Sequence, residues 1–576
     1  MLIRAVLLIR LHLRQALGRS SLDGMLLWAT LVGVVGGASS ALFREAAIGL
    51  EWLLTGRTAD LVSVATSLPV DKRVWIPAIG GLVAGTVLAL GARLFRRGRA
   101  VDYLEAINVG DGHIPLGPTL ARLGSSLCSI GSGSSIGREG GMVQFSALLA
   151  SSIGGAFRLS RPRLRLLVAC GGAAGIASAY NTPLAGALFI AEIVLQSLSI
   201  EILGPLVVAS VLATLTIRQW IGLRPIFEAP DFGPLPSQGI LPVLGLGLLA
   251  GLLAPLFLVL LERSRRLFRR SRLPLPLSLG LGGLLVGLVS VAEPGVWGNG
   301  HAVVDALLND TPERHAVMSL LLLKILATAA AVGSGAVGGV FTPTLFIGAG
   351  IGWLFGDAMH AWLPEAGAAA VTYAVLGMGA FLAGTTHAPV MAILMVFEMT
   401  QDADLLFPLI VASISARYLS AAVRPKTVYA DALGQESPAY PWSLRVAALQ
   451  LPAGRSVTAD APMAAVCRLF SRHSMQHLWV VDAGGVYRGA IALQAAASLA
   501  PREVERGATY PGAAYPKFAG ECLDETLPQL SPDSPLAEAL ASFERTGADR
   551  LPVVDAGGLL AGEIARVDVL LSFKQL

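Results

Sequence analysis

The chain has 576 residues, of which 54% are hydrophobic and only 14% are charged. Soluble proteins carry roughly a quarter charged residues, so this composition excludes an ordinary soluble protein and predicts a polytopic helical membrane protein. The apolar runs are continuous rather than alternating, which excludes a membrane β-barrel. The net charge of +4 comes mainly from clustered arginines, which indicate cytosolic loops rather than a nucleic-acid-binding surface.

The chain begins with an apolar stretch, residues 1–20, in which Arg14 and Arg19 follow the apolar part. A signal peptide clusters its charge first, so we expect an interfacial amphipathic helix on the cytosolic face. Leu22–Leu54 and Val74–Leu94 are predicted membrane helices. The four cysteines are scattered without a Cys-x-x-Cys pair, which predicts neither a disulfide framework nor a zinc site.

The stretch Gly131–Gly141 is rich in glycine and places Glu139 at membrane depth. An ionisable side chain there is costly and indicates a functional site. The glycines indicate a broken helix, and Met142–Gly155 continues as helical turns. Free amides at a helix N-terminus attract anions. Close helix packing is the alternative role for such glycines, but packing does not require the charged pair Arg138 and Glu139.

Two segments of the first half of the chain recur in the second half. Gly131–Gly141 recurs as Gly333–Pro343, and Pro183–Glu192 recurs as Pro389–Glu398. Duplicated halves with matching glycine and proline breaks are typical of transporters with an ion site at the middle of the membrane. We therefore expect two helices, beginning near Glu139-Gly140 and near Val340-Phe341, to point their N-termini at one anion. The halves are inverted if an odd number of membrane crossings separates them.

Glu192 and Glu398 occupy matching positions late in apolar segments of the two halves. A glutamate there either caps a neighbouring loop or pairs with an arginine, or it transfers protons. Because both halves carry the residue, we favour a structural role for both acids.

The composition changes after Leu433. Residues 434–443 read as a polar linker, and two modules, 444–507 and 519–576, follow. Asp460–Pro462 recurs as Asp533–Pro535, and Val480–Gly485 recurs as Val553–Gly558. Each module has the pattern strand, helix, strand, turn, strand and helix, which predicts a pair of small α/β domains.

Together these features resemble the CLC family of chloride channels and chloride/proton antiporters. Gly137-Arg138-Glu139-Gly140 is similar to the family's G-[KR]-E-G-P loop, which carries the gating glutamate, and Gly339–Pro343 is similar to its G-x-F-x-P loop. Tyr429 falls where the family places a tyrosine that binds the central anion. The modules at 444–507 and 519–576 resemble tandem CBS domains.

The resemblance implies an all-α membrane domain at 21–433, with inverted repeats at about 22–220 and 240–433 and broken re-entrant helices, followed by the CBS pair. It implies a homodimer with one pore per subunit and Glu139 as the gate. The implied anion-binding residues are Arg138, Gly140, Val340, Phe341 and Tyr429.

The chain departs from the family pattern at several positions. The family's G-S-G-I-P loop is replaced by a segment near Gly98–Tyr103, so the serine of the central site is missing. Gly141 stands where proline is usual, and Ile193 stands where antiporters usually carry a second glutamate. These departures indicate the ClcB-like bacterial branch of the family.

The CBS pair retains little of the family's nucleotide-binding signature. Asp568 is placed to hold a ribose, but Ala565 stands at the usual Ser/Thr position, and Gly489–Ala496 has no aspartate. Adenine-nucleotide regulation stays open as one interpretation, and structural dimerisation is the interpretation that we favour. No other cofactor and no metal is expected.

From the resemblance we expect transport of chloride, a small monovalent anion, across the bacterial inner membrane, channel-like or voltage-dependent, with both termini cytoplasmic. The alternative is a chloride/proton antiporter with a non-standard proton path, and fluoride is a less favoured substrate. An enzyme is not expected, because none of the eight histidines is followed by glutamate, as a His-Glu-x-x-His protease requires. A Gly-Lys dipeptide, which an ATP-driven pump with a P-loop needs, is also absent from the sequence.

Overall fold

The structure is a computed structural model and divides into two compact units, Met1–Leu433 (the membrane unit) and Gly434–Leu576 (the C-terminal unit). It describes residues 22–57, 60–95, 100–108, 110–222, 227, 239–309, 312–362, 369–429, 445–449, 454–472, 476–493, 495, 518–524, 527–546, 548–566 and 569. The expected interfacial helix at 1–20, the linker at 434–443 and Asp568 lie outside the described residues.

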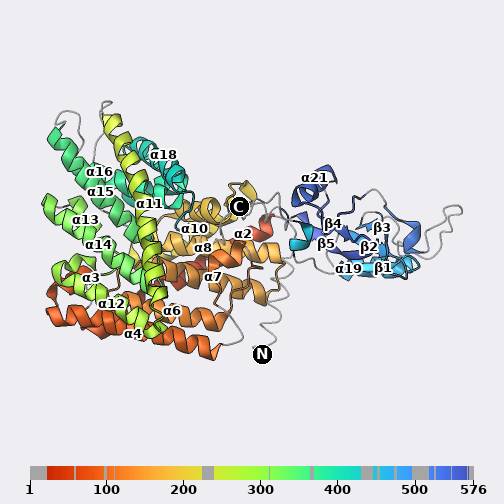
Figure 1. Cartoon of the computed structure of the whole chain (residues 1–576), viewed down its shortest axis with the longest axis horizontal. Coiled ribbons are helices and arrows are strands. Elements are labelled where there is room, and N and C mark those ends of the chain that lie inside the picture. Colours follow the sequence, from red (N-terminus) through yellow and green to blue (C-terminus); the bar gives the residue numbers. More distant parts are fainter. Residues whose placement is uncertain are drawn as a thin grey trace. The chain divides into compact units, whose positions relative to one another are not determined.

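The membrane unit is a bundle of helices (Figure 1). Its helices are α2 (Leu22–Thr55), α3 (Leu61–Ser67), α4 (Val70–Leu94), α5 (Tyr103–Asn108), α6 (Leu116–Gly131), α7 (Glu139–Ala156), α8 (Arg161–Tyr180), α9 (Pro183–Leu188), the π-helical turn η1 (Phe189–Val194), α10 (Ile200–Ile221), α11 (Ile240–Arg270), α12 (Leu275–Ala292), the 3-10 turn η3 (Pro294–Val296), α13 (His301–Asn309), α14 (Arg314–Ser334), α15 (Phe341–Trp362), α16 (Ala370–Thr386), α17 (Pro389–Thr400) and α18 (Leu406–Val423).

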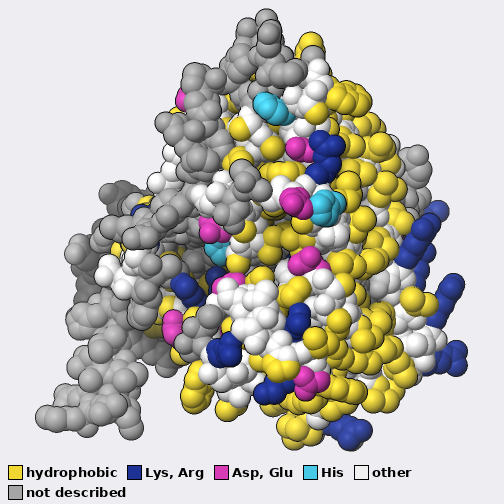
Figure 2. Space-filling view, turned by 90° about the vertical axis from the view of Figure 1, so that its left-hand side faces the viewer, with side chains coloured by type: hydrophobic (Ala, Val, Ile, Leu, Met, Phe, Trp, Pro, Cys, Tyr) yellow, Lys and Arg dark blue, Asp and Glu magenta, His cyan; other side chains and the backbone are white. Residues whose placement is uncertain are grey.

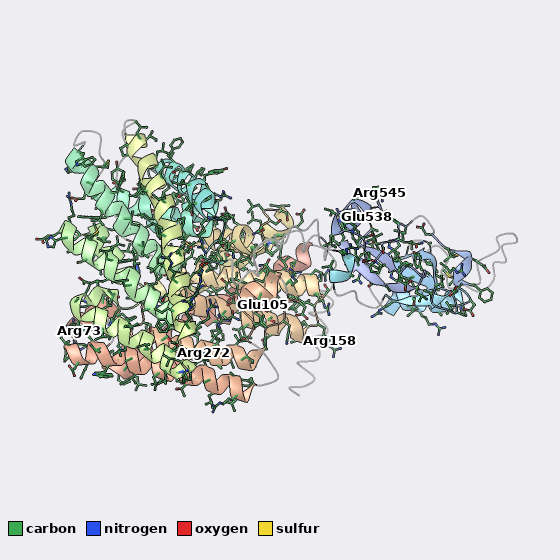
Figure 3. The ribbon with its side chains drawn as sticks, in the orientation of Figure 1. Arg73, Glu105, Arg158, Arg272, Glu538 and Arg545 are labelled. Atoms are coloured by element: carbon green, nitrogen blue, oxygen red, sulfur yellow. The ribbon has the colours of Figure 1, made fainter. Side chains whose placement is uncertain are left out.

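Several of these helices have the length and hydropathy of membrane spans. Within the described residues they are α2, α4, α10, α11, α12, α14 and α18. Figure 2 shows hydrophobic side chains over much of the visible face, with charged side chains grouped among them. In Figure 3, Arg73 in the first turn of α4 and Arg158 just after α7 lie toward opposite ends of the bundle. The fold predicted from the sequence, a polytopic helical membrane domain, is confirmed.

Small residues let the long helices approach closely, and the same contact occurs in both halves. Glycines of α2 lie against alanines of α10, and glycines of α11 lie against alanines of α18 in the same way. A Cβ atom on any of these glycines would lie 2.6 to 2.7 Å from an alanine carbonyl oxygen, in the pairs Gly33 with Ala209, Gly37 with Ala213, Gly247 with Ala412 and Gly251 with Ala416. The packing therefore repeats the duplication that the sequence predicts.

The apolar runs around Pro183 and Pro389 are broken at the same point in each half. Asn181 follows α8 with a φ of 53°, and His387 follows α16 with a φ of 59°. Each break is followed after one residue by proline, which lacks an N–H and begins the next helix, α9 or α17. These turns change the direction of the chain, so that α9 and α17 do not continue the axes of α8 and α16.

The C-terminal unit contains two small sheets. β1 (Ser456–Thr458) pairs in parallel with β2 (His477–Val481), which pairs antiparallel with β3 (Tyr487–Ala492), and α19 spans Met463–Arg472. In the second module, β4 (Arg550–Val554) pairs antiparallel with β5 (Leu560–Ala565) after α21 (Leu536–Thr546). A single parallel bridge from Leu530 to Val553 stands where the first strand is expected. The expected α/β pair is confirmed.

We expect Gly37→Ala and Gly251→Ala each to destabilise the membrane unit. The added methyl group collides with a backbone oxygen of α10 or α18, and overpacking costs about 1–3 kcal/mol. The measurement is the unfolding temperature of the purified protein in detergent. Gly49→Ala is the matched control on α2, because a Cβ there has no neighbour within 4 Å. Equal unfolding temperatures for all three variants would contradict this account.

Candidate functional site

The two glycine-rich segments meet as an antiparallel pair. The Gly137 N–H donates to the Gly339 carbonyl at 2.8 Å, and the Gly339 N–H donates to the Gly137 carbonyl at 2.9 Å. These two glycines are the equivalent residues of the two repeats. Their pairing brings the helices that follow, α7 and α15, to a common point from the two halves of the unit. The expected convergence of two helix N-termini is therefore present.

Glu139 is the first residue of α7 and its side chain is only 3% exposed. Its carboxylate lies on the first turn of α15. One oxygen accepts from the Thr342 N–H at 3.1 Å, and the other accepts from the Thr342 hydroxyl at 3.2 Å. The acid of one repeat thus occupies the positive end of a helix dipole in the other repeat, where an anion is stabilised.

Thr342 has a second partner, which the sequence analysis did not find. Its hydroxyl lies 2.8 Å from the hydroxyl of Tyr180, the last residue of α8. Because an ionised Glu139 only accepts hydrogen bonds, the Thr342 hydroxyl donates to it and the Tyr180 hydroxyl donates to Thr342. The sequence signal for Thr342 as a site residue was its hydroxyl group in the first helical turn after a glycine break.

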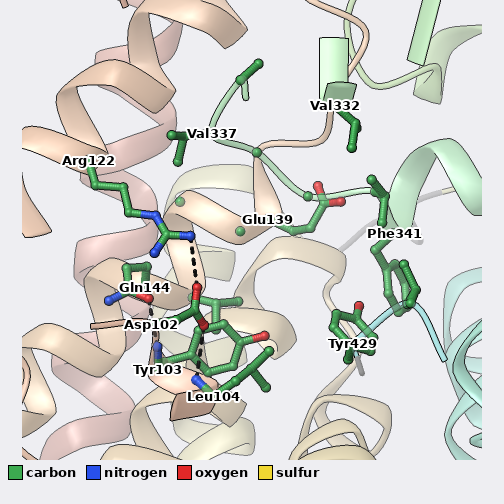
Figure 4. Close-up of a pocket in the computed structure, with 18 of the residues that line it drawn as sticks. Asp102, Tyr103, Leu104, Arg122, Glu139, Gln144, Val332, Val337, Phe341 and Tyr429 are labelled. Atoms are coloured by element: carbon green, nitrogen blue, oxygen red, sulfur yellow. Dashed lines mark hydrogen bonds and ion pairs between the residues drawn. The ribbon is translucent and has the colours of Figure 1, made fainter. Parts of the chain in front are cut away.

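The cavity next to Glu139, called the Glu139 cavity below, has a volume of about 340 Å³. Residues from both repeats line it, and Figure 4 shows how they face one another. The lining includes Glu139, Gly140, Val340, Phe341 and Tyr429, all expected site residues. In the described part of the chain, the N–H groups of Val340 and Phe341 donate to no protein acceptor. These two amides and the Tyr429 hydroxyl are hydrogen-bond donors that border the cavity.

Aromatic rings form one wall of the Glu139 cavity. The ring of Phe189 stands edge-on to Tyr429, with centroids 5.5 Å apart, and Phe341 lies 6.0 Å from Phe189. In Figure 4 the hydroxyl of Tyr429 points toward Glu139. An apolar wall with few polar groups strengthens each hydrogen bond to a desolvated ion.

The described part of the segment that replaces the family's first loop, residues 100–103, leads into α5. Its first two amides are already bound by side chains, since Tyr103 N–H donates to Gln144 at 2.9 Å and Leu104 N–H donates to Asp102 at 3.1 Å. Asp102 also pairs with Arg122 at 3.0 Å. Figure 4 shows these contacts at the Glu139 cavity, away from α15. The sequence analysis missed these groups, although an aspartate before an apolar helix is a capping signal.

Arg138 does not line the Glu139 cavity. It lines a second cavity of about 330 Å³, together with residues of α2 and α13 (the Arg138 cavity). Successive residues at the start of a helix point in different directions, which separates Arg138 from Glu139. Arg138 is thus the one expected anion-binding residue that the structure places outside the Glu139 cavity.

Glu192 and Glu398 each cap the N-terminus of a helix in the opposite repeat. Glu192 accepts from the amides of Val390 and Met391 at 3.3 and 2.7 Å, at the start of α17. Glu398 accepts from the amides of Leu184 and Ala185 at 3.0 and 2.8 Å, at the start of α9. This reciprocal geometry supports the structural interpretation of both acids.

A duplicated helical membrane domain, with two broken helices that aim free amides at one cavity, defines an ion-transport protein of the inverted-repeat class. Residues 94–421 match the family described as Voltage gated chloride channel, and residues 519–574 match the CBS domain family. The chain therefore belongs to the voltage-gated chloride channel (CLC) family, on its ClcB-like branch, with a C-terminal CBS pair. The expected family is confirmed.

Named relatives are consistent with this assignment. The chain is 48% identical over 415 residues to a putative chloride channel protein ClcB-like from Ralstonia nicotianae, a match covering 71% of this chain and 97% of that protein. It is 42% identical over 410 residues to the voltage-gated ClC-type chloride channel ClcB of Citrobacter koseri, covering 70% and 97%. A crystal structure of a slow cyanobacterial Cl⁻/H⁺ antiporter matches with a TM-score of 0.62 and 26% identity, covering 71% and 97%.

We expect Glu192→Gln and Glu398→Gln each to lower stability without changing the pH dependence of transport. Each substitution replaces an acceptor oxygen facing an amide with an NH₂ group, and a lost hydrogen bond to a charged group costs about 1.5–3 kcal/mol. Unfolding temperature and anion flux from liposomes at several pH values measure both effects. Glu45→Gln, an exposed position on α2, is the control. A changed pH profile with unchanged stability would instead indicate proton transfer.

Proposed function

We propose that this protein transports chloride passively through the Glu139 cavity, with Glu139 as the gate. The observation that carries the proposal is the position of the Glu139 carboxylate on the first turn of α15. It lies beside the amides of Val340 and Phe341, which donate to no acceptor among the described residues. A carboxylate and a halide compete for such donors. Occupied by Glu139, the site is closed to the anion.

The donors in this site are neutral groups. Amide N–H groups and the Tyr429 hydroxyl bind a partly dehydrated anion without a full positive charge at α15. Binding of this kind is weak enough for release, which conduction requires. Larger or multiply charged anions lose more hydration energy than these few donors return, so a small monovalent anion fits best.

Protonation of Glu139 removes the negative charge that holds its side chain on α15. A protonated acid competes less well for the Thr342 donors, and an anion then takes its place. Flux therefore rises as the pH falls. Chloride/proton exchange is the second candidate, since the cyanobacterial structure named above is that of a Cl⁻/H⁺ antiporter.

We further propose that the protein works as a homodimer in the bacterial inner membrane, with both termini in the cytoplasm and one pathway per subunit. The family membership supports this assembly. Light scattering in detergent and protease accessibility in oriented membrane vesicles test the subunit number and the orientation. In this proposal the CBS pair serves dimerisation rather than nucleotide binding.

Glu139→Ala is expected to abolish the pH dependence of chloride flux, since the side chain that competes with the anion is gone. The measurement is chloride efflux from proteoliposomes between acidic and neutral pH. A pH dependence that survives unchanged in the variant would rule out Glu139 as the gate. In the same vesicles, uphill chloride movement driven by a proton gradient would establish the exchanger, and passive flux alone would favour the channel.

Thr342→Val is expected to raise flux at neutral pH and to shift the activation midpoint upward by about one to two pH units. It removes the hydroxyl that donates to Glu139, and such a bond to a charged acceptor contributes about 1.5–3 kcal/mol. Thr344→Val is the matched control, because the Thr344 hydroxyl donates to Val340 of its own helix at 2.7 Å. Identical pH profiles for the two variants would contradict the closed state described above.

A further inference from the structure

The Glu139 cavity carries an ion pair that has no role in the proposed function. Asp102 and Arg122 both line the cavity, and their side chains lie 3.0 Å apart. The side chain of Arg122 is 34% exposed and that of Asp102 is 24% exposed, whereas Glu139 is only 3% exposed. The ion pair therefore lies at the solvent end of the cavity, called the mouth below, and Glu139 lies at the buried end.

The mouth opens on the side of the membrane unit that carries the arginine-rich end of α11. Arg265, which lies in the last turns of that helix, also lines the cavity. Clustered arginines mark the cytoplasmic side of a membrane protein. An anion that passes between the cytoplasm and Glu139 therefore passes the pair of Asp102 and Arg122.

The backbone around Asp102 is fixed by the helix that carries the gate. Gln144 of α7 is buried, and its amide nitrogen donates to the Val101 carbonyl at 3.0 Å. Its amide oxygen accepts from the Tyr103 N–H at 2.9 Å. One side chain thus binds the chain on both sides of Asp102, so the position of this residue relative to α7 is fixed.

The carboxylate of Asp102 is fixed as well. One oxygen accepts from the Leu104 N–H at 3.1 Å and caps α5, and the other oxygen meets the Arg122 guanidinium of α6. Ion pairs that face solvent contribute little to stability. The negative charge is therefore a permanent feature of the mouth that the stability of the fold does not explain.

The second repeat anchors the corresponding segment without an acidic side chain. Lys324 is the equivalent of Arg122, since each stands nine residues before the matching glycine, Gly333 or Gly131. Lys324 is buried and donates to two backbone carbonyls in the segment before α13, both at 2.8 Å. Backbone oxygens are thus sufficient partners for the basic residue at this position of the fold.

The second repeat also caps the short helix with a neutral side chain. Asn299 accepts from the His301 N–H at 3.2 Å at the start of α13, with the same two-residue spacing as Asp102 and Leu104. Asn and Asp are equally good capping residues. The cap therefore does not require the charge of Asp102, and what this charge adds is the neutralisation of Arg122 in the cavity.

We propose that Asp102 controls the entry of anions into the Glu139 cavity from the cytoplasm by neutralising Arg122 at the mouth. The inference rests on the proposed function, because it concerns the path of the transported anion. A cleft with walls of low dielectric focuses the field of its charges, and a positive mouth raises the local anion concentration. With Asp102 paired to it, Arg122 attracts anions weakly, and the cavity fills only at high chloride concentration.

The first test is Asp102→Asn, which keeps the cap and removes the charge. We expect the chloride concentration for half-maximal flux to fall by about threefold to tenfold at low ionic strength. This difference should shrink when an impermeant salt is added, because the Debye length is about 10 Å at 0.1 M ionic strength. The measurement is the initial rate of chloride efflux from proteoliposomes containing the full-length protein, at the pH of maximal flux.

Asp111→Asn is the matched control. Asp111 is exposed, and its carboxylate accepts from the His113 N–H at 3.1 Å, which is the same capping geometry as that of Asp102. It is not among the residues that line the Glu139 cavity. Asp102→Asn and Asp111→Asn should have equal unfolding temperatures, and equal half-maximal concentrations for the two variants would overturn the proposal.

Substitution of Arg122 should have the opposite effect. Arg122→Gln is expected to raise the half-maximal chloride concentration by a similar factor, and Arg122→Lys, which keeps the charge, should restore it. In the double variant Asp102→Asn/Arg122→Gln the two changes should cancel, because the net charge of the mouth is that of the unmodified protein. Changes that add in the same direction would indicate a structural role and contradict the proposal.

The two proposals fail in different ways. If the unmodified protein moves no chloride, the proposed function fails and this inference fails with it. If chloride moves but Asp102→Asn behaves as Asp111→Asn does, only this inference fails. Should Arg122→Gln not fold, the effect of Asp102→Asn at low and high ionic strength decides alone.

Discussion

Two hydrogen bonds between Gly137 and Gly339 hold the two halves of the membrane unit in register. They join equivalent residues, so an approximate two-fold axis passes between them. A Cβ on Gly137 would lie 2.0 Å from the Glu139 carboxylate, and a Cβ on Gly339 would lie 2.5 Å from it. Only glycine leaves room for the carboxylate to cross from α7 to α15. The backbone pairing and the position of Glu139 are therefore one feature, since the contact that joins the repeats also places the acid on the opposite helix.

The molecule uses the same electrostatic device at three places. Glu139, Glu192 and Glu398 each bind amides at the start of a helix in the other repeat. The three glutamates differ in how many of the amides at the helix start they bind. Glu192 and Glu398 bridge two successive amides after a proline, and these contacts close the helix end. On α15, Glu139 accepts from Thr342, and among the described residues the amides of Val340 and Phe341 stay open toward a cavity. An acid that saturates a helix end stabilises the fold, whereas an acid that leaves donors open can be replaced by an anion.

Local signals in the sequence predict the features that depend on local chemistry. The glycine breaks locate the starts of α7 and α15, and the matching prolines locate α9 and α17, because backbone freedom and a missing N–H act within a few residues. Thr342 and Gln144 were missed because their roles depend on contacts between elements distant in the chain, as does the ion pair of Asp102 with Arg122. The family resemblance placed Arg138 with Glu139 at the anion site, because both belong to the same loop motif. At a helix start, consecutive side chains diverge by roughly 100°, and here they reach two different cavities.

This divergence gives the two charged residues at the start of α7 chemically different surroundings. Glu139 lies on the first turn of α15, beside a cavity lined by the neutral amides of Val340 and Phe341. Arg138 lies in a cavity that Arg44, Glu51 and Asp60 also line, so its guanidinium is surrounded by charged side chains of both signs. Neutral dipoles bind an anion weakly enough for release, whereas opposite full charges favour fixed ion pairs. The proposed exchange with an anion therefore belongs at the acid and not at the arginine beside it.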